Sequence, residues 1–392
     1  MIFLGLASNY SFQDVLRHSF ALGSNRDYNN LERALAEKYA APLEKTSLIY
    51  SGRSAISLAL KSFIASGKLH TGDSVVINSF TCHAVLEAVK SAGLKPVFAD
   101  LERLKTGEIL PNYSATTLAS LVKTNKTVRA FILQNTFGLP VNIKSFETVR
   151  KKYNLLLLED LAHCAGRKYP DGREIGTVGD ATCLSFGKGK SLDTITGGAV
   201  LLRNPDLSFP KSFSKSALKK RRKTGDVPRA SWYPLLGAIA RGLSYLHLEK
   251  FWLGFLLKTH WLERSADTKL DESTTVTNWQ SRLALRQLET LSTTAKTPLR
   301  RYFLVDDRDT CLKELRNHGA RLEESWYEVP VSPVRYYPSV HFPETSCPNA
   351  VFFASHVINL PTWYTSPAKQ KQVKLAEKIL KSHALKPEDQ HA

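Results

Sequence analysis

The chain has 392 residues, which is enough for two domains with a sizeable apolar core. Its 54 basic and 36 acidic side chains give a formal charge of +18, which favours anionic partners such as nucleic acid, lipid headgroups or phosphorylated substrates. Five dispersed cysteines without a Cys-x-x-Cys pair argue against a disulfide framework or a zinc site. No apolar run reaches the roughly 18 residues of a membrane span, so we expect a cytoplasmic protein in a reducing compartment.

The first part of the chain predicts a helix and then a strand-turn-helix unit. The segment from Asn30 has the apolar spacing of an amphipathic helix, with Asn29 or Asn30 as its N-cap. A short strand over 47–50 leads through the turn 51–55 into a helix over 56–65. Backbone N–H groups point outward where a glycine turn opens a helix, so this turn predicts a phosphate or other anion site.

The next part of the chain has a regular β-α-β rhythm. Strands are expected over 74–77, 96–98 and 129–133, with a helix over 84–91 after the first of them. Alternating strands and helices of this length imply a mostly parallel sheet with right-handed crossovers.

Two buried strands then end in chemically active side chains. Four leucines, 155–158, predict a strand buried on both faces that ends in Glu159 and Asp160. A second buried strand leads into a loop that contains Lys188 and Lys190. Ligands bind at the carboxyl ends of parallel strands, so the acid and the lysine form either a structural ion pair or the two ends of a cofactor site. Pyridoxal phosphate (PLP) fits the second interpretation, since it needs a lysine for its aldehyde and a carboxylate for its ring nitrogen.

This segment resembles the DegT/StrS family of PLP-dependent aminotransferases, many of which act on nucleotide-linked keto-sugars. The resemblance rests on Glu159-Asp160, on the Ser-Phe-x-x-x-Lys pattern that starts at Ser185, and on the Gly-Gly-Ala strand at 197–199. It covers roughly 29–205 and 277–380. It implies an α/β, fold-type-I PLP transferase with a large domain, whose mostly parallel sheet has seven strands, and a small α/β C-terminal domain. A homodimer with active sites at the interface is implied as well.

The resemblance also implies roles for single residues. The spacing selects Lys190 over Lys188 for the Schiff base, and Asp160 pairs with the ring nitrogen. His163 would lie near the ring oxygen, and Ser185 would bind the phosphate. The catalytic residues would be Lys190 and Asp160, and the cofactor-binding residues Gly52, Arg53, Ser54, His83, Asp160, His163, Ser185 and Lys190, with no metal.

Three positions depart from the family pattern. Arg53 stands where the family has threonine in the phosphate turn, which adds a positive charge. Cys82 stands where the family usually has an aromatic ring over the cofactor, so His83, or else Phe80, is expected to stack there. The stretch 273–275 replaces an Asn-Tyr-Arg-like segment that reaches the partner subunit's phosphate site in the family.

Residues 211–270 form a region without family resemblance. The run 211–223 holds seven basic and no acidic side chains, and 231–262 is rich in Trp, Leu and Phe at helical spacing. We favour an inserted helical hairpin packed on the large domain or across the dimer interface. Peripheral binding to anionic membrane at the inner face is the alternative, and nucleic acid is not expected because no binding motif accompanies the charge. The expected domains are therefore 1–210, 211–270 and 271–392.

The expected function is transfer of an amino group, from glutamate by family analogy, to a keto-sugar in amino-sugar or surface-polysaccharide biosynthesis. Nucleotide linkage of that sugar is implied by the resemblance. One alternative is keto-sugar dehydration, which Lys190 argues against because family dehydratases typically carry histidine there. The other is a non-catalytic homologue that binds a membrane or a partner.

Overall fold

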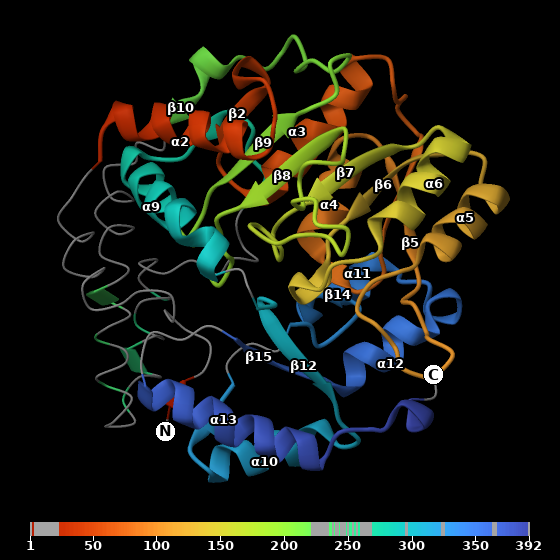
Figure 1. Cartoon of the computed structure of the whole chain (residues 1–392), viewed down its shortest axis with the longest axis vertical. Coiled ribbons are helices and arrows are strands. Elements are labelled where there is room, and N and C mark those ends of the chain that lie inside the picture. Colours follow the sequence, from red (N-terminus) through yellow and green to blue (C-terminus); the bar gives the residue numbers. More distant parts are fainter. Residues whose placement is uncertain are drawn as a thin grey trace.

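A computed structural model describes residues 2–3, 23–220, 269–294, 297–322, 326–362 and 367–390, and single positions between 235 and 258 (Figure 1). Most of the predicted insertion lies outside the described residues, so the hairpin and membrane interpretations stay predictions, as do the domain boundaries. Within the described ranges no helix is both long and apolar enough to cross a membrane.

A seven-stranded sheet forms the centre of the large unit, in the order β2-β9-β8-β7-β6-β3-β5. Its strands are β2 (Thr46–Ile49), β3 (Ser74–Asn78), β5 (Lys95–Ala99), β6 (Val128–Leu133), β7 (Leu156–Asp160), β8 (Ala181–Ser185) and β9 (Gly198–Leu202). Strand β9 is antiparallel to both β2 and β8, and the other pairs are parallel. This confirms the predicted α/β fold with a mostly parallel seven-stranded sheet.

Helices cover both faces of the sheet, because successive side chains of a strand point to opposite sides. Leu157 packs into the core on one face and Leu158 into the core on the other. The first face is covered by α2 (Asn25–Lys38), α5 (Ala115–Thr124), α6 (Ile143–Tyr153) and α9 (Asn278–Thr294), the second by α3 (Gly52–Ala65) and α4 (His83–Ser91).

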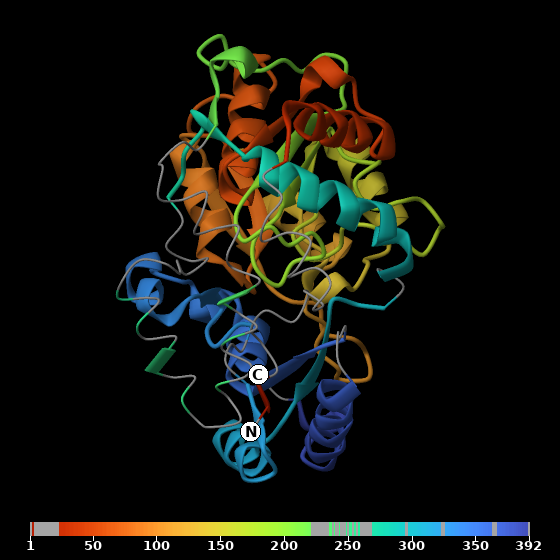
Figure 2. The same ribbon diagram turned by 90° about the vertical axis from the view of Figure 1, so that its left-hand side faces the viewer.

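A smaller C-terminal unit lies beyond one end of the sheet in both views (Figures 1 and 2). Its strands β12 (Arg300–Leu304) and β15 (Val357–Pro361) pair antiparallel and share a core with α10 (Arg308–Asn317) and α13 (Pro367–Ser382). Strand β14 (Val331–Ser332) pairs with β4 (Thr81–Cys82) and so joins this unit to the large one.

The remaining elements are short. They are β1 (Ile2–Phe3) with its partner β13 (Ala320–Arg321), β10 (Lys219–Lys220) with its partner β11 (Thr274–Thr275), α11 (Tyr337–Val340), α12 (Pro348–His356), and the 3-10 turns Leu43–Lys45, Thr136–Gly138, Lys215–Ala217, Val334–Tyr336, Glu344–Ser346 and Pro387–Asp389.

Two predicted boundaries are wrong. Helix α2 begins at Asn25 and is capped by Ser24, not by Asn29 or Asn30, because Ser24 and Asp27 form a reciprocal capping box. Helix α3 begins at Gly52, four residues before the expected start. Strand β7 ends at Asp160, as predicted, so the two acids belong to the strand.

The position of Glu159 inside β7 determines what it does. Adjacent strand residues point to opposite faces, so Glu159 and Asp160 serve different sides of the sheet. The Glu159 side chain is fully buried and accepts hydrogen bonds from the Tyr169 hydroxyl (2.8 Å) and from the backbone N–H groups of Gly176 (2.8 Å), Val178 (2.8 Å) and Gly179. It therefore holds the loop between β7 and β8 in place.

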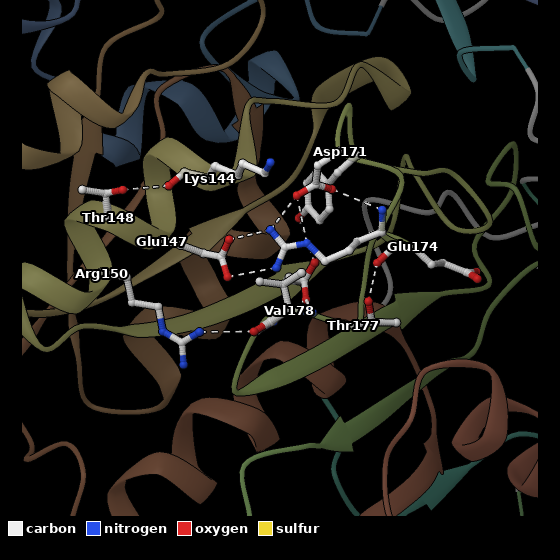
Figure 3. Close-up of polar contacts among 12 residues, drawn as sticks. Lys144, Glu147, Thr148, Arg150, Asp171, Glu174, Thr177 and Val178 are labelled. Carbon is white, nitrogen blue, oxygen red and sulfur yellow. Dashed lines mark hydrogen bonds and ion pairs between the residues drawn. The ribbon is translucent and has the colours of Figure 1, made fainter.

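The outer side of this loop is fastened to α6 (Figure 3). Arg173 binds Glu147 of α6 at 2.5 Å and Asp171 of its own loop at 2.6 Å. Arg150, also on α6, donates to the carbonyl of Val178 at 3.2 Å. The Arg173 contact lowers the pKa of Glu147, yet this pair is partly exposed and its net stabilisation is small.

We expect Glu159→Gln to destabilise the protein by about 3 kcal/mol, because an amide nitrogen would face N–H donors in a buried site. Comparing urea denaturation of this variant with that of Glu147→Gln measures the difference. The Glu147 variant should lose less than about 1 kcal/mol. Equal losses in the two variants would contradict the assignment of Glu159 as the buried anchor.

Candidate active site

A cavity of about 560 Å³ lies where β7 and β8 end and the C-terminal unit meets the large one. Six of the predicted site residues line it, namely Gly52, Arg53, Asp160, His163, Ser185 and Lys190. Lys188 lines it too, whereas Ser54 and His83 are not part of the lining. Segments that are far apart in the sequence therefore meet in one site.

One wall of the cavity is the first turn of α3 against the end of β8. A Cβ added to Gly52 would lie 2.6 Å from the Cβ of Ser185, closer than real Cβ atoms approach. Glycine therefore allows the helix start to approach the Ser185 hydroxyl. The first N–H groups of a helix have no intrahelical acceptor, so this corner is suited to an anion.

Arg53 adds a full positive charge to this wall. The Arg53 residue is 9% exposed, and its guanidinium forms an ion pair with Glu87 of α4. The pair fixes Arg53 beside the helix start. This geometry agrees with the expected extra charge in the anion turn.

Asp160 lies in a strongly desolvated position. Asp160 is 3% exposed, and one of its carboxylate oxygens accepts a hydrogen bond from the N–H of Ala162 at 3.0 Å. Burial raises the pKa of Asp160 to about 6, although the Ala162 hydrogen bond and the charge of Lys190 act in the opposite direction. A cationic partner placed against this carboxylate would favour its ionised form and so lower its pKa.

Two sets of hydrogen bonds hold the loop that carries Lys190. Asp193 accepts the N–H groups of Gly189 (2.9 Å) and Ile195 (3.1 Å), and its own N–H donates to Gln287 of α9 at 2.6 Å. A second glutamine of α9, Gln280, donates to the carbonyls of Thr194 (3.1 Å) and Thr196 (2.8 Å). Helix α9 thus sets the position of the lysine loop.

His163 is neutral and has a defined tautomer. Burial, then the charges of Lys190 and Arg300, lower its pKa well below the usual value. Its Nδ1 accepts the N–H of Phe137 at 3.1 Å, so the hydrogen is on Nε2, which lies 3.4 Å from the Tyr327 hydroxyl. The imidazole can therefore serve as a neutral hydrogen-bonding group.

Two predicted residues have other contacts. The Ser54 hydroxyl lies 3.0 Å from that of Ser51 and accepts the N–H of Asp271 at 3.0 Å. His83 stacks on Tyr336, with ring centroids 4.6 Å apart. Neither side chain reaches the cavity lining, and their cofactor contacts stay predictions without support from this geometry.

Sequence reasoning missed residues supplied by distant segments. Trp326 and Tyr327 line the cavity, whereas Phe80 packs with Tyr327, ring centroids 5.2 Å apart, outside that lining. No periodic pattern distinguishes the aromatic pair at 326–327. Gln280 and Gln287 are seven residues apart and therefore lie on one face of α9. This spacing was the sequence pattern that could have predicted their hydrogen bonds to the lysine loop.

The lining fits PLP in three respects. The Gly52–Ser185 corner with Arg53 offers N–H groups, a hydroxyl and a charge to a phosphate. Asp160 offers a buried carboxylate that favours a cation, as a protonated ring nitrogen would be. Lys190 offers the amine to which an aldehyde binds covalently, in the same cavity.

Fold and cavity together define the class of fold-type-I transferases, since the sheet, the anion turn, the acid and the lysine occur in one arrangement. The family model of the DegT/DnrJ/EryC1/StrS aminotransferase family matches residues 7–225, more than half of the chain. The chain belongs to this family, as the sequence predicted.

Curated relatives match over part of their length only. A dTDP-4-dehydro-2,6-dideoxy-D-glucose 3-dehydratase of Saccharopolyspora spinosa is 31% identical over 170 residues, which cover 42% of this chain and 35% of the relative. A GDP-perosamine synthase of Escherichia coli O157:H7 is 28% identical over 195 residues, 50% of this chain and 49% of the relative. The chain thus matches from about a third to half of these relatives.

Solved structures resemble the chain over nearly its whole length. A putative sugar aminotransferase of Streptococcus pneumoniae in its PLP form superposes with a TM-score of 0.62, covering 97% of this chain and 96% of that chain at 16% identity. At this identity the similarity establishes the fold. The family and these neighbours are PLP-dependent.

The raised pKa of Asp160 has a consequence for stability without cofactor. A pKa of about 6 in the folded chain, against 3.8 unfolded, means that the folded state holds the proton more tightly. The stability therefore falls as the pH rises from about 4 to about 6 and stays lower above that, by about 3 kcal/mol.

We expect cofactor-free Asp160→Asn to be more stable than the unmodified chain at pH 8, by up to about 3 kcal/mol, and nearly equal to it at pH 4. Urea denaturation at both pH values measures this. Asp206→Asn is the control, because its partner Lys68 lowers the pKa of this exposed acid, so its loss should slightly destabilise at pH 8. A less stable Asp160→Asn at pH 8 would contradict the desolvation argument.

Proposed function

We propose that this chain is a PLP-dependent aminotransferase that moves an amino group from an amino acid, glutamate in the first instance, to a nucleotide-linked keto-sugar. The observation that carries the proposal is that a buried acid and a lysine, Asp160 and Lys190, line one cavity with an anion-binding helix start. Family membership and the sugar-related names of its relatives support the substrate class.

Each end of the cavity has a separate role in holding the cofactor. Gly52, Arg53 and Ser185 would bind its phosphate, and Asp160 would pair with its ring nitrogen. Bound PLP would supply an electron sink for the carbon from which a proton is removed. His163 would offer a neutral imidazole at the ring edge, where its Nε2–H also faces the Tyr327 hydroxyl at 3.4 Å.

Lys190 is the group that would move protons. With PLP bound, its Nζ would hold the aldehyde covalently, and the free amine could accept and return a proton as a general acid–base. The Asp193 and Gln280 contacts keep its loop in place during this change. A protonated ring nitrogen would offset the cost of burying the Asp160 charge and so favour the ionised carboxylate.

Keto-sugar dehydration is the second candidate, because one relative is named as a 3-dehydratase. A lysine at position 190 favours amino transfer, since an amine can both bind the cofactor and carry the proton. We also propose that the active form is a homodimer, which analytical ultracentrifugation can test.

To test the proposal, the PLP-loaded protein is incubated with L-glutamate and a panel of UDP-, GDP- and dTDP-linked 4-keto- and 3-keto-sugars. We expect 2-oxoglutarate and an amino-sugar in equal amounts by mass spectrometry. Asp160→Asn should reduce turnover by at least about 100-fold, since a neutral amide cannot hold the ring nitrogen protonated. It should still retain PLP after desalting, because the phosphate contacts remain.

Lys126→Ala is a suitable control, as this lysine lies in the turn before β6, outside the cavity lining. Its turnover should equal that of the unmodified chain. Loss of a hydroxyl from the sugar without formation of 2-oxoglutarate would favour the dehydratase. Near-normal turnover of Asp160→Asn would show that another group pairs with the ring.

A further inference from the structure

Trp326 is an aromatic side chain in direct contact with Lys190. Its residue is 9% exposed and lines the cavity. The Nζ atom of Lys190 lies 4.3 Å from the centroid of its ring. A reacting carbon bonded at or near this amine would therefore lie within contact distance of the indole.

The indole is held in place by its neighbours. Its ring stacks on that of His163 at 5.0 Å with an interplanar angle of 17°, and the Arg300 guanidinium carbon lies 4.3 Å from its centroid. A Cβ added to Gly189 would lie 3.5 Å from the indole Cζ2, so the ring also rests against the lysine loop.

The backbone of Trp326 is fixed as well. The amide of Asn359 donates to the Trp326 carbonyl, and Arg300 donates to the amide oxygen of Asn359. Arg300 and Asn359 belong to the paired strands β12 and β15. The two-stranded sheet of the C-terminal unit thus positions this tryptophan over the lysine of the large unit.

The rest of the cavity lining is mixed. Arg53, Asp160, Lys188 and Glu328 are charged, and the aliphatic side chains include Ile56, Val85 and Ile195. Tyr327 also lines the cavity, but its hydroxyl is directed to His163 and its ring packs on Phe80. Trp326 supplies the large aromatic ring against which the Lys190 amine lies, while His163 and Arg300 cover other parts of that ring.

We infer that Trp326 is the specificity wall of this site: the sugar ring of the amino acceptor packs its C–H face against the indole on the side that Lys190 contacts, with its carbonyl carbon at the Lys190 amine. Such a wall favours a pyranose ring over a linear keto acid, because an aromatic face gains most from a flat apolar surface. The inference rests on the proposed function, since it assumes a sugar acceptor.

The test is calorimetric binding to the PLP-loaded protein, without turnover. The probes are UDP-N-acetylglucosamine, GDP-mannose and dTDP-glucose, each compared with its matching nucleoside diphosphate. The ratio of the two dissociation constants measures what the sugar adds. We expect at least one probe to bind more tightly than its diphosphate, and Trp326→Ala to reduce that ratio by roughly tenfold.

Two further variants serve as controls. Trp326→Phe should keep most of the ratio, because a ring remains, and it guards against misfolding of the alanine variant. Trp252→Ala removes a tryptophan that is outside the cavity lining and should leave the ratio unchanged. The affinity for the free diphosphates should change less than about twofold in all variants.

Three outcomes would overturn the inference. An unchanged ratio in Trp326→Ala would show that the indole does not touch the sugar, and the proposed function would stand. A loss of PLP affinity with an intact ratio would assign Trp326 to the cofactor instead. If no nucleotide sugar binds the unmodified chain, the proposed acceptor class fails, and this inference fails with it.

Discussion

A carboxylate held in the apolar interior at the end of β7 is the constraint on which the site depends. Burial raises the pKa of Asp160 because few groups compensate its charge. The neighbouring Glu159, on the opposite side of the same strand, is fully compensated by four hydrogen bonds. The strand therefore carries one acid that stabilises the fold and one that lowers its stability until a cation arrives. Function and stability are divided between two consecutive residues.

The rest of the cavity is assembled around this acid by elements distant in the sequence. Helix α9 holds the lysine loop through two glutamines, and the strands β12 and β15 hold Trp326 over the lysine. The bridge between β4 and β14 joins the same two units. Because Trp326 is held by the C-terminal unit, a change in the relative position of the two units would change its distance to the acid and the lysine of the large unit.

Short sequence patterns predicted the strand ends that carry the acid and the lysine. The leucine run before Asp160 and the Ser-Phe-x-x-x-Lys spacing placed the acid and the lysine at one edge of the sheet, and both line the cavity. The start of α2 was harder to predict. Asn29 and Asn30 are also favourable N-cap residues, and the reciprocal hydrogen bonds of Ser24 and Asp27 are seen only in the structure. Trp326 and the stacking of His83 on Tyr336 could not be predicted, because they depend on how the C-terminal unit docks.

The central claim is that Lys190, and not its neighbour Lys188, holds the cofactor covalently. The most direct measurement is borohydride reduction of the PLP-loaded protein, followed by proteolysis and mass spectrometry of the peptides that contain either lysine. Our account predicts the reduced pyridoxyl group on Lys190 alone, with none on the peptides of Lys190→Ala. A pyridoxyl group on Lys188, or on no lysine of this loop, would contradict it.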